Sequence, residues 1–170
     1  MPRRRGLAIA AVTLTFALVS GGVAHAYVFG TAASPMTLKI DGVTLGQARG
    51  SMDLATASSF TTSSVYVKDP IANGNGVFFK VDTNYYARWY NDNLAGPYFG
   101  WFTSERVRTG AYTTNAWSYY ANQTKTVVAD DYLQDLLGNY GFTIYMRVCE
   151  DRGILRADPC YSVKQSYVWS

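Results

Sequence analysis

The fold is decided by two runs near the C-terminus: Gly141-Phe-Thr-Ile-Tyr-Met-Arg-Val-Cys149 and Cys160-Tyr-Ser-Val-Lys-Gln-Ser-Tyr-Val-Trp169. In the first run, apolar side chains recur at every second position, at Phe142, Ile144, Met146 and Val148. A period of two is typical of a half-buried strand. The second run is rich in aromatic and β-branched residues, which favour strands. Together the two runs predict a C-terminal β-hairpin.

The start of the chain has the pattern of a secretory signal peptide. Arginines at positions 3–5 precede an apolar run over residues 7–19, and Ala24-His25-Ala26 fits the small-x-small rule for signal peptidase. A membrane-spanning helix needs about 20 apolar residues, which is more than this run offers. The sequence therefore predicts a secreted protein, cleaved after Ala26, with no membrane anchor.

Cleavage would change the charge and the chemistry of the chain. The full chain has 15 basic and 12 acidic residues, and loss of three arginines leaves 12 against 12, so the formal net charge falls from +3 to zero. A neutral chain gives no reason to expect binding to nucleic acid or to an anionic membrane. His25, the only histidine, is also lost. The mature chain therefore has no histidine to act as a general base or a metal ligand.

The two cysteines are expected to form a disulfide. Paired cysteines are usual in exported proteins, and Cys149 and Cys160 stand at the facing ends of the two predicted strands. Closing a loop of about a dozen residues stabilises a domain by roughly 3 kcal/mol in the chain-entropy model. We expect this bond to be structural and not redox-active.

Residues 27–63 differ in composition from residues 64–170. They are rich in Ala, Ser, Thr and Gly and poor in aromatic residues, so they have little apolar surface with which to form a core. Around the turn signal at residues 41 and 42, apolar residues alternate at Met36, Leu38, Ile40, Val43 and Leu45. This pattern fits either strands that complete the domain's own sheet or an extended arm that binds a partner protein through these five residues.

Residues 64–170 predict a β-domain. Strands are expected at 64–68, 77–81, 85–90, 101–108 and 112–121, separated by turn-rich segments. Short strands without a long helical period indicate an antiparallel β-sandwich. The exception is the segment 130–138, which has helical spacing between an Asp cap and Gly138. The expected fold is therefore all-β: an antiparallel β-sandwich with one short helix and an N-terminal extended arm.

Acidic residues offer the only route to catalysis. Glu105 and Glu150 are the only glutamates, and a carboxylate pair can hydrolyse a glycosidic bond, although nothing in their spacing selects them. Aspartates at positions 130, 131 and 135 have oxygen atoms that suit Ca²⁺, but helix capping explains the first two. The sequence has no nucleophile motif or phosphate loop. We expect no enzymatic activity, no cofactor and no bound metal, and a carboxylate-based hydrolase is the weakest alternative.

Aromatic residues are concentrated between positions 85 and 102: Tyr85, Tyr86, Trp89, Tyr90, Tyr98, Phe99, Trp101 and Phe102. In strands about half of these side chains point away from the core, so we expect an exposed aromatic surface of the kind that marks binding sites. Trp89 and Trp101 are the predicted contacts. Tryptophan and tyrosine suit both protein interfaces and sugar-stacking faces, so protein binding and binding of cell-wall carbohydrate both stay open.

The segments Arg147-Val-Cys-Glu-Asp-Arg152 and Ala157-Asp-Pro-Cys160 resemble the C-terminal signature of small secreted actinobacterial proteins. The overall plan is similar to that of the small adaptor subunit of umbrella toxin particles. In that family the adaptor joins a lectin-bearing subunit to a long toxin-bearing subunit, and its N-terminal strap lies in a cleft of the lectin-bearing partner. The resemblance implies a non-enzymatic adaptor in an extracellular toxin complex, with residues 27–60 as the strap.

Overall fold

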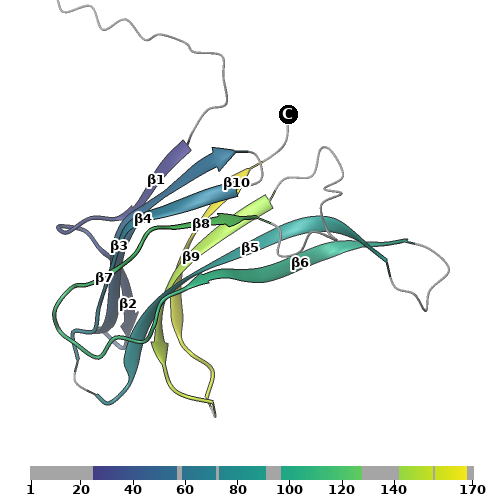
Figure 1. The fold of residues 1–170 in the computed structure, drawn as a ribbon. Helices are drawn as coiled ribbons and strands as arrows, with labels where there is room; N and C mark the ends of the chain where they lie inside the picture. The colour runs from purple at the N-terminus through teal and green to yellow at the C-terminus, as the bar shows by residue number, and fades with distance from the viewer. Residues whose placement is uncertain are drawn as a thin grey trace, which may run out of the picture.

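The structure is a computed structural model that describes residues 25–56, 59–71, 73–90, 97–127, 142–154 and 156–167; for residues 25, 55, 56, 87–90 and 97–99 it describes the backbone only. The described residues form ten strands in two antiparallel sheets, and no helix is found among them. Figure 1 shows the two sheets lying against each other as the layers of a sandwich-like all-β fold.

The first sheet has two long central strands with short strands along both edges. The central strands are β3 (Val43–Thr56) and β4 (Ser59–Lys68). The edge strands are β1 (His25–Gly30), β2 (Met36–Ile40), β7 (Ser118–Tyr120) and β8 (Gln123–Thr126). β2 and β1 pair with successive halves of β3, and β8 and β7 pair with successive parts of β4.

The second sheet has the strand order β10 (Cys160–Tyr167), β9 (Phe142–Asp151), β5 (Gly76–Tyr90) and β6 (Pro97–Arg108). β9 and β10 form the predicted C-terminal hairpin, in register from Cys160 opposite Cys149 to Tyr167 opposite Phe142. The predicted disulfide is confirmed: the two cysteine sulfurs are 2.00 Å apart.

The core lies between the inner faces of the two sheets. The four apolar residues of β9 that alternate in the sequence are buried, as predicted. They pack in one cluster with side chains from the other strands, among them Phe29, Met36, Leu38, Met52, Phe60, Val65, Phe79, Val81 and Tyr85. Phe29 of β1 stacks on Phe79 of β5 with ring centroids 4.8 Å apart, so the N-terminal strand is joined directly to the centre of the second sheet.

The structure does not confirm a separate N-terminal arm. The residues expected to form it make up β1, β2, β3 and the first part of β4. Met36 and Leu38 are each only 4% exposed, in the core. Ile40 and Leu45 are partly buried, and only Val43 among the five predicted contact residues is exposed, at 49%.

A tight turn explains why this segment folds back on its own domain. Asp41 and Gly42 have φ values of 50° and 80°, which is the left-handed backbone that a two-residue hairpin requires. The turn pairs β2 with β3, and Met36 and Leu38 of β2 and Ala48 of β3 are buried in the core between the sheets. Of the two alternatives that the sequence left open, this arrangement is the one in which the segment completes the domain's own sheet.

Several boundaries differ from the prediction. β5 is continuous where two strands were expected, and β6 begins at Pro97. The segment 112–121 was expected to be one strand. In the structure its paired parts are β7 and Tyr112, which forms an isolated bridge with Val77. The predicted helix at 130–138 and residues 1–24 of the predicted signal peptide lie outside the described residues, whereas His25 and Ala26 begin β1.

Candidate binding surface

Within the described part of the chain, the β5–β6 hairpin extends beyond the other strands of the second sheet. β5 pairs with β9 as far as Tyr85 opposite Phe142, whereas its pairing with β6 continues from Tyr86 opposite Trp101 to Tyr90 opposite Pro97. At about 3.4 Å per residue this continuation adds roughly 15 Å to the hairpin. Figure 1 shows the two strands projecting past the body of the molecule.

Aromatic pairs lie on both faces at the base of this projection. On the inner face Tyr85, which is 1% exposed, stacks on Phe102 with ring centroids 6.1 Å apart. On the outer face Trp101 packs edge-on against Tyr86 at 5.5 Å and remains 61% exposed. The alternation along the strand therefore buries one ring of the aromatic segment and presents the next to solvent.

The predicted contact residues do not form one surface. Trp101 is exposed on the second sheet, whereas Val43 is exposed at the turn of the first sheet. Trp89 lies opposite Tyr98 in the hairpin backbone, and its side chain is outside the described part of the structure. Contact between any of these residues and a partner stays a prediction.

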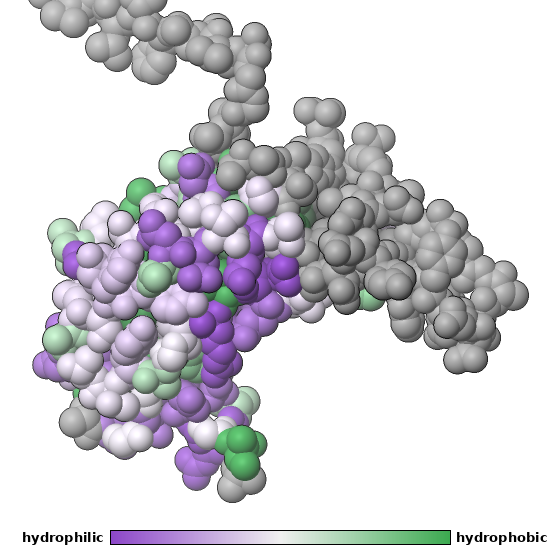
Figure 2. All heavy atoms as spheres, viewed as in Figure 1, coloured by the Kyte–Doolittle hydropathy of each residue, from purple (hydrophilic) through white to green (hydrophobic). Residues whose placement is uncertain are grey.

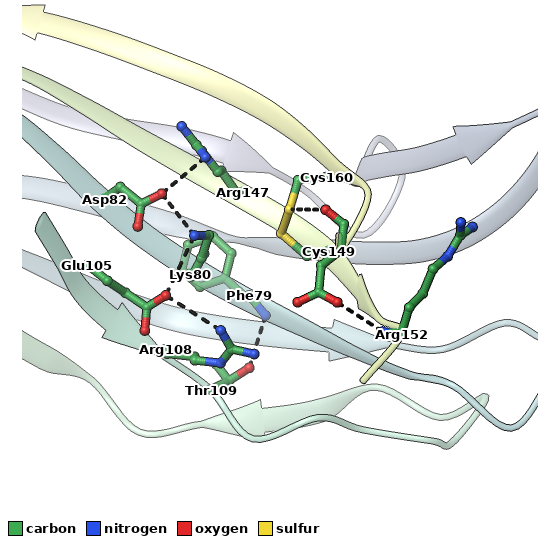
Figure 3. Close-up of a disulfide and its surroundings, with 11 residues drawn as sticks. Phe79, Lys80, Asp82, Glu105, Arg108, Thr109, Arg147, Cys149, Arg152 and Cys160 are labelled. Atoms are coloured by element: carbon green, nitrogen blue, oxygen red, sulfur yellow. Dashed lines mark hydrogen bonds and ion pairs between the residues drawn. A yellow bond between two sulfur atoms is a disulfide. The ribbon is translucent and has the colours of Figure 1, made fainter. Parts of the chain in front are cut away.

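An ion-pair network that the sequence did not predict covers the outer face of the second sheet (Figure 3). Asp82 is only 3% exposed, and its Oδ2 lies 3.2 Å from Lys80 Nζ and 3.3 Å from Arg147 Nη1. A carboxylate with so little access to water is stable only when it is paired, because its lost hydration costs several kcal/mol. The two cations on β5 and β9 supply that pairing.

The network continues onto β6. Glu105 Oε2 lies 3.6 Å from both Lys80 Nζ and Arg108 Nη1, and the Arg108 guanidinium lies 3.8 Å from the centre of the Phe78 ring. Lys80 stands directly opposite Arg108 on one side and Arg147 on the other. Lys80 and Asp82 are near each other on β5, and Glu105 and Arg108 are near each other on β6. Strand pairing joins these two local pairs to each other and to Arg147 of β9, and that connection was not visible in the sequence.

Glu105 and Glu150 are not brought together as a catalytic pair. Glu105 is opposite Asp82, and Glu150 is opposite Val77. Five residues of β5 separate these positions, a backbone distance of about 17 Å. The carboxyl groups of glycosidases are separated by about 5–10 Å.

Glu150 instead holds the loop that precedes β5. It is 2% exposed, and its Oε1 accepts hydrogen bonds from Asn73 Nδ2 at 2.6 Å and Asn75 Nδ2 at 3.2 Å. Arg152 Nε donates to Oε2 at 2.8 Å. Burial alone would raise the pKa of Glu150, but the hydrogen bonds from Arg152, Asn73 and Asn75 outweigh it, and the pKa lies below its ordinary value.

Figure 2 shows hydrophilic residues gathered on the side of the molecule that leads down to the loop joining β9 to β10. The outer face of the second sheet therefore combines an exposed tryptophan with a polar, internally paired surface.

Among the described residues, no three His, Cys, Asp or Glu side chains are grouped so that they could hold a metal ion. The three aspartates considered for Ca²⁺ lie outside those residues. No helix in the described ranges has the length and hydrophobicity needed to cross a membrane. Comparison with protein-family models, curated proteins and solved structures finds no match to the chain.

Proposed function

We propose that the protein is a secreted, non-enzymatic binding protein with an antiparallel β-sandwich fold, and that it joins other proteins outside the cell through its β5–β6 hairpin. One observation carries the proposal: the hairpin projects past the sheet with Trp101 61% exposed on its outer face. A two-stranded ribbon is marginally stable alone, and tryptophan is enriched among the residues that dominate binding energies. A partner would cover the ring and stabilise the ribbon.

An extracellular location is supported by two features of the chain. The Cys149–Cys160 bond is of a kind that persists in oxidising compartments. The first 26 residues have the pattern of a secretory signal peptide. Both fit a protein that meets its partner outside the cell.

The resemblance to the umbrella toxin adaptor gives the class of partner. In this proposal the partners are subunits of a secreted toxin complex, such as a lectin-bearing subunit and a large toxin subunit. The strap that the resemblance implies corresponds to residues 27–60, which here supply buried residues such as Leu38 and Met52 to the core. The proposal therefore assigns partner contact to the hairpin in place of the strap.

Co-purification from culture supernatant tests this assignment. Trp101→Ala should reduce the recovery of the partner at least tenfold, since truncation of a central tryptophan commonly costs 2 kcal/mol or more. Tyr161→Ala is the matched control, because Tyr161 is a 45% exposed aromatic residue on the edge strand of the same sheet. Equal recovery with both variants would contradict the proposal, provided that both retain the disulfide and the melting temperature of the wild type.

The outer face of the second sheet favours a second candidate, binding of cell-wall carbohydrate. A polar surface next to an exposed tryptophan suits a sugar ring, which stacks its apolar face on an aromatic side chain and places its hydroxyls against polar groups. Retention on purified cell-wall polysaccharide, lost in Trp101→Ala and kept in Tyr161→Ala, together with no co-purifying protein, would select this candidate over the adaptor.

A further inference from the structure

Arg49 is held between aromatic side chains on the outer face of the first sheet. Its Cζ lies 4.4 Å from the centre of the Tyr66 ring and 4.8 Å from that of Trp117. Tyr66 is its direct neighbour across the β3–β4 pair. Contacts of this kind fix the plane of the guanidinium before any ligand arrives.

The charge of Arg49 is not neutralised within the described part of the chain. No ion pair or hydrogen bond there involves its guanidinium, and its Nε is buried without a hydrogen-bond partner. Arg108 provides the contrast, because it also lies on an aromatic ring but is paired with Glu105.

Arg49 lines an open pocket whose other walls come from three segments: Gly30, Thr31, Ala32, Gly50, Ser64 and Tyr66. The strand register shifts beside Arg49, between residues 49 and 51 of β3, and such bulges bend a strand and re-aim its side chains. Gly50 has a φ of 151°, and a Cβ there would lie 2.7 Å from Phe29 Cζ. A glycine is therefore required at the bulge that shapes this wall.

We infer that this Arg49 pocket binds a carboxylate. The edge of a guanidinium offers two parallel N–H groups that match the two oxygens of a carboxylate. One guanidinium in the pocket matches a singly charged planar ligand better than a tetrahedral dianion. The pocket goes beyond the proposed function, because it lies on the first sheet and the hairpin belongs to the second.

Titration of the ¹⁵N-labelled protein with sodium acetate at constant ionic strength tests the site directly. The Nε–H resonance of Arg49 should shift and saturate, whereas that of Arg108 should not respond, because its carboxylate partner is already in place. Sodium sulfate should give no saturating shift at Arg49. Because the wild-type protein is used, no substitution has to be tolerated by the fold.

The source of the carboxylate is distinguished by two further titrations, one with an aspartate-containing peptide and one with galacturonate. Tighter binding of the peptide assigns a protein partner, and tighter binding of galacturonate assigns an acidic glycan. Arg49→Lys, which keeps the charge but loses the planar fork, should weaken the better ligand by about tenfold, and Arg108→Lys should leave its affinity unchanged.

Three results would overturn the inference: no saturating shift at Arg49 with acetate, equal shifts at Arg49 and Arg108, or a saturating shift with sulfate as well. Trp101→Ala should bind acetate as the wild type does. If Trp101→Ala loses the partner and Arg49 still responds to acetate, the hairpin and the Arg49 pocket act independently. If the partner is lost but Arg49 never responds, only the carboxylate site is wrong; if Arg49 responds but the partner is retained, only the hairpin proposal is wrong.

Discussion

Gly46 of β3 lies so close to Val77 of β5 that no side chain fits between them. A Cβ at position 46 would be 2.7 Å from Val77 Cγ1 and 3.2 Å from Val77 Cγ2. Val77 is 1% exposed and β-branched, so it has little freedom to move aside. The first sheet therefore comes within contact distance of the second at a glycine.

Gly46→Ala is expected to destabilise the protein by about 1–3 kcal/mol, the usual cost of overpacking a core. The matched control is Gly110→Ala, because nothing lies within 4 Å of a Cβ at position 110; we expect a change within about 0.5 kcal/mol. Urea denaturation of both variants measures the difference. Equal midpoints would show that the sheets do not meet at this glycine.

The C-terminal hairpin was predictable because its information is local. The four apolar residues of β9 alternate without a break, and the cysteines mark the ends of both strands. The same alternation predicted the set of buried residues in β9.

The role of residues 27–63 was not predictable in the same way. Their small residues suggested too little apolar surface for a core. In the structure one of these small residues, Gly46, allows the two sheets to approach each other closely. Met52 and Phe60 are fully buried although they stand in polar surroundings in the sequence. The ion pairs around Asp82 and the aromatic contacts of Arg49 likewise depend on pairing between strands, which the sequence does not specify locally.

Leu38→Ala distinguishes a core strand from an arm. Leu38 is 4% exposed, so its truncation should cost about 2–5 kcal/mol, as for other buried leucines. Val43→Ala, at the 49% exposed position of the same hairpin, should change the free energy of unfolding much less. If residues 27–60 were a free arm, neither substitution would alter the urea midpoint.

Asp82→Asn should destabilise the protein more than Glu105→Gln. The side chain of Asp82 is 4% exposed, and its carboxylate faces two cations that an amide would leave without a counter-charge. We expect a loss of about 3–5 kcal/mol, the usual cost of removing one partner of a buried pair. The Glu105 side chain is 40% exposed, and exposed pairs contribute about 0–1 kcal/mol. Guanidinium chloride would screen both pairs, so urea is the denaturant to use, and similar losses for the two variants would contradict the ranking.

The disulfide should contribute about 3 kcal/mol, since it closes a loop with a sequence separation of 11 residues. The free energy of unfolding of the double variant Cys149→Ser, Cys160→Ser should be lower than that of the wild type by that amount, and its urea midpoint should fall accordingly. Reductant should shift the wild-type midpoint to the variant's value and leave the variant unchanged. A wild-type midpoint that does not respond to complete reduction would contradict a stabilising role.

Glu150 should make the stability of the loop before β5 depend on pH. Its pKa lies below the ordinary value of 4.5, because hydrogen bonds from Arg152, Asn73 and Asn75 outweigh the effect of burial. A carboxyl group that is more acidic in the folded than in the unfolded chain stabilises the folded state above the unfolded pKa, and that stability is lost as the pH falls through the folded pKa. Its contribution should therefore be complete at pH 7 and decline below about pH 4.5.

Comparison of the wild type with Glu150→Gln over this range measures the contribution. The glutamine cannot carry the charge that Arg152 pairs with, so the variant should be less stable than the wild type at pH 7, and the gap between them should narrow towards pH 3. Amide exchange in the loop should report the same change locally, because Asn73 and Asn75 bind the carboxylate directly. A gap that is constant from pH 7 to pH 3 would mean that the ionised carboxylate does not hold the loop, and that Glu150 contributes by its shape and packing alone.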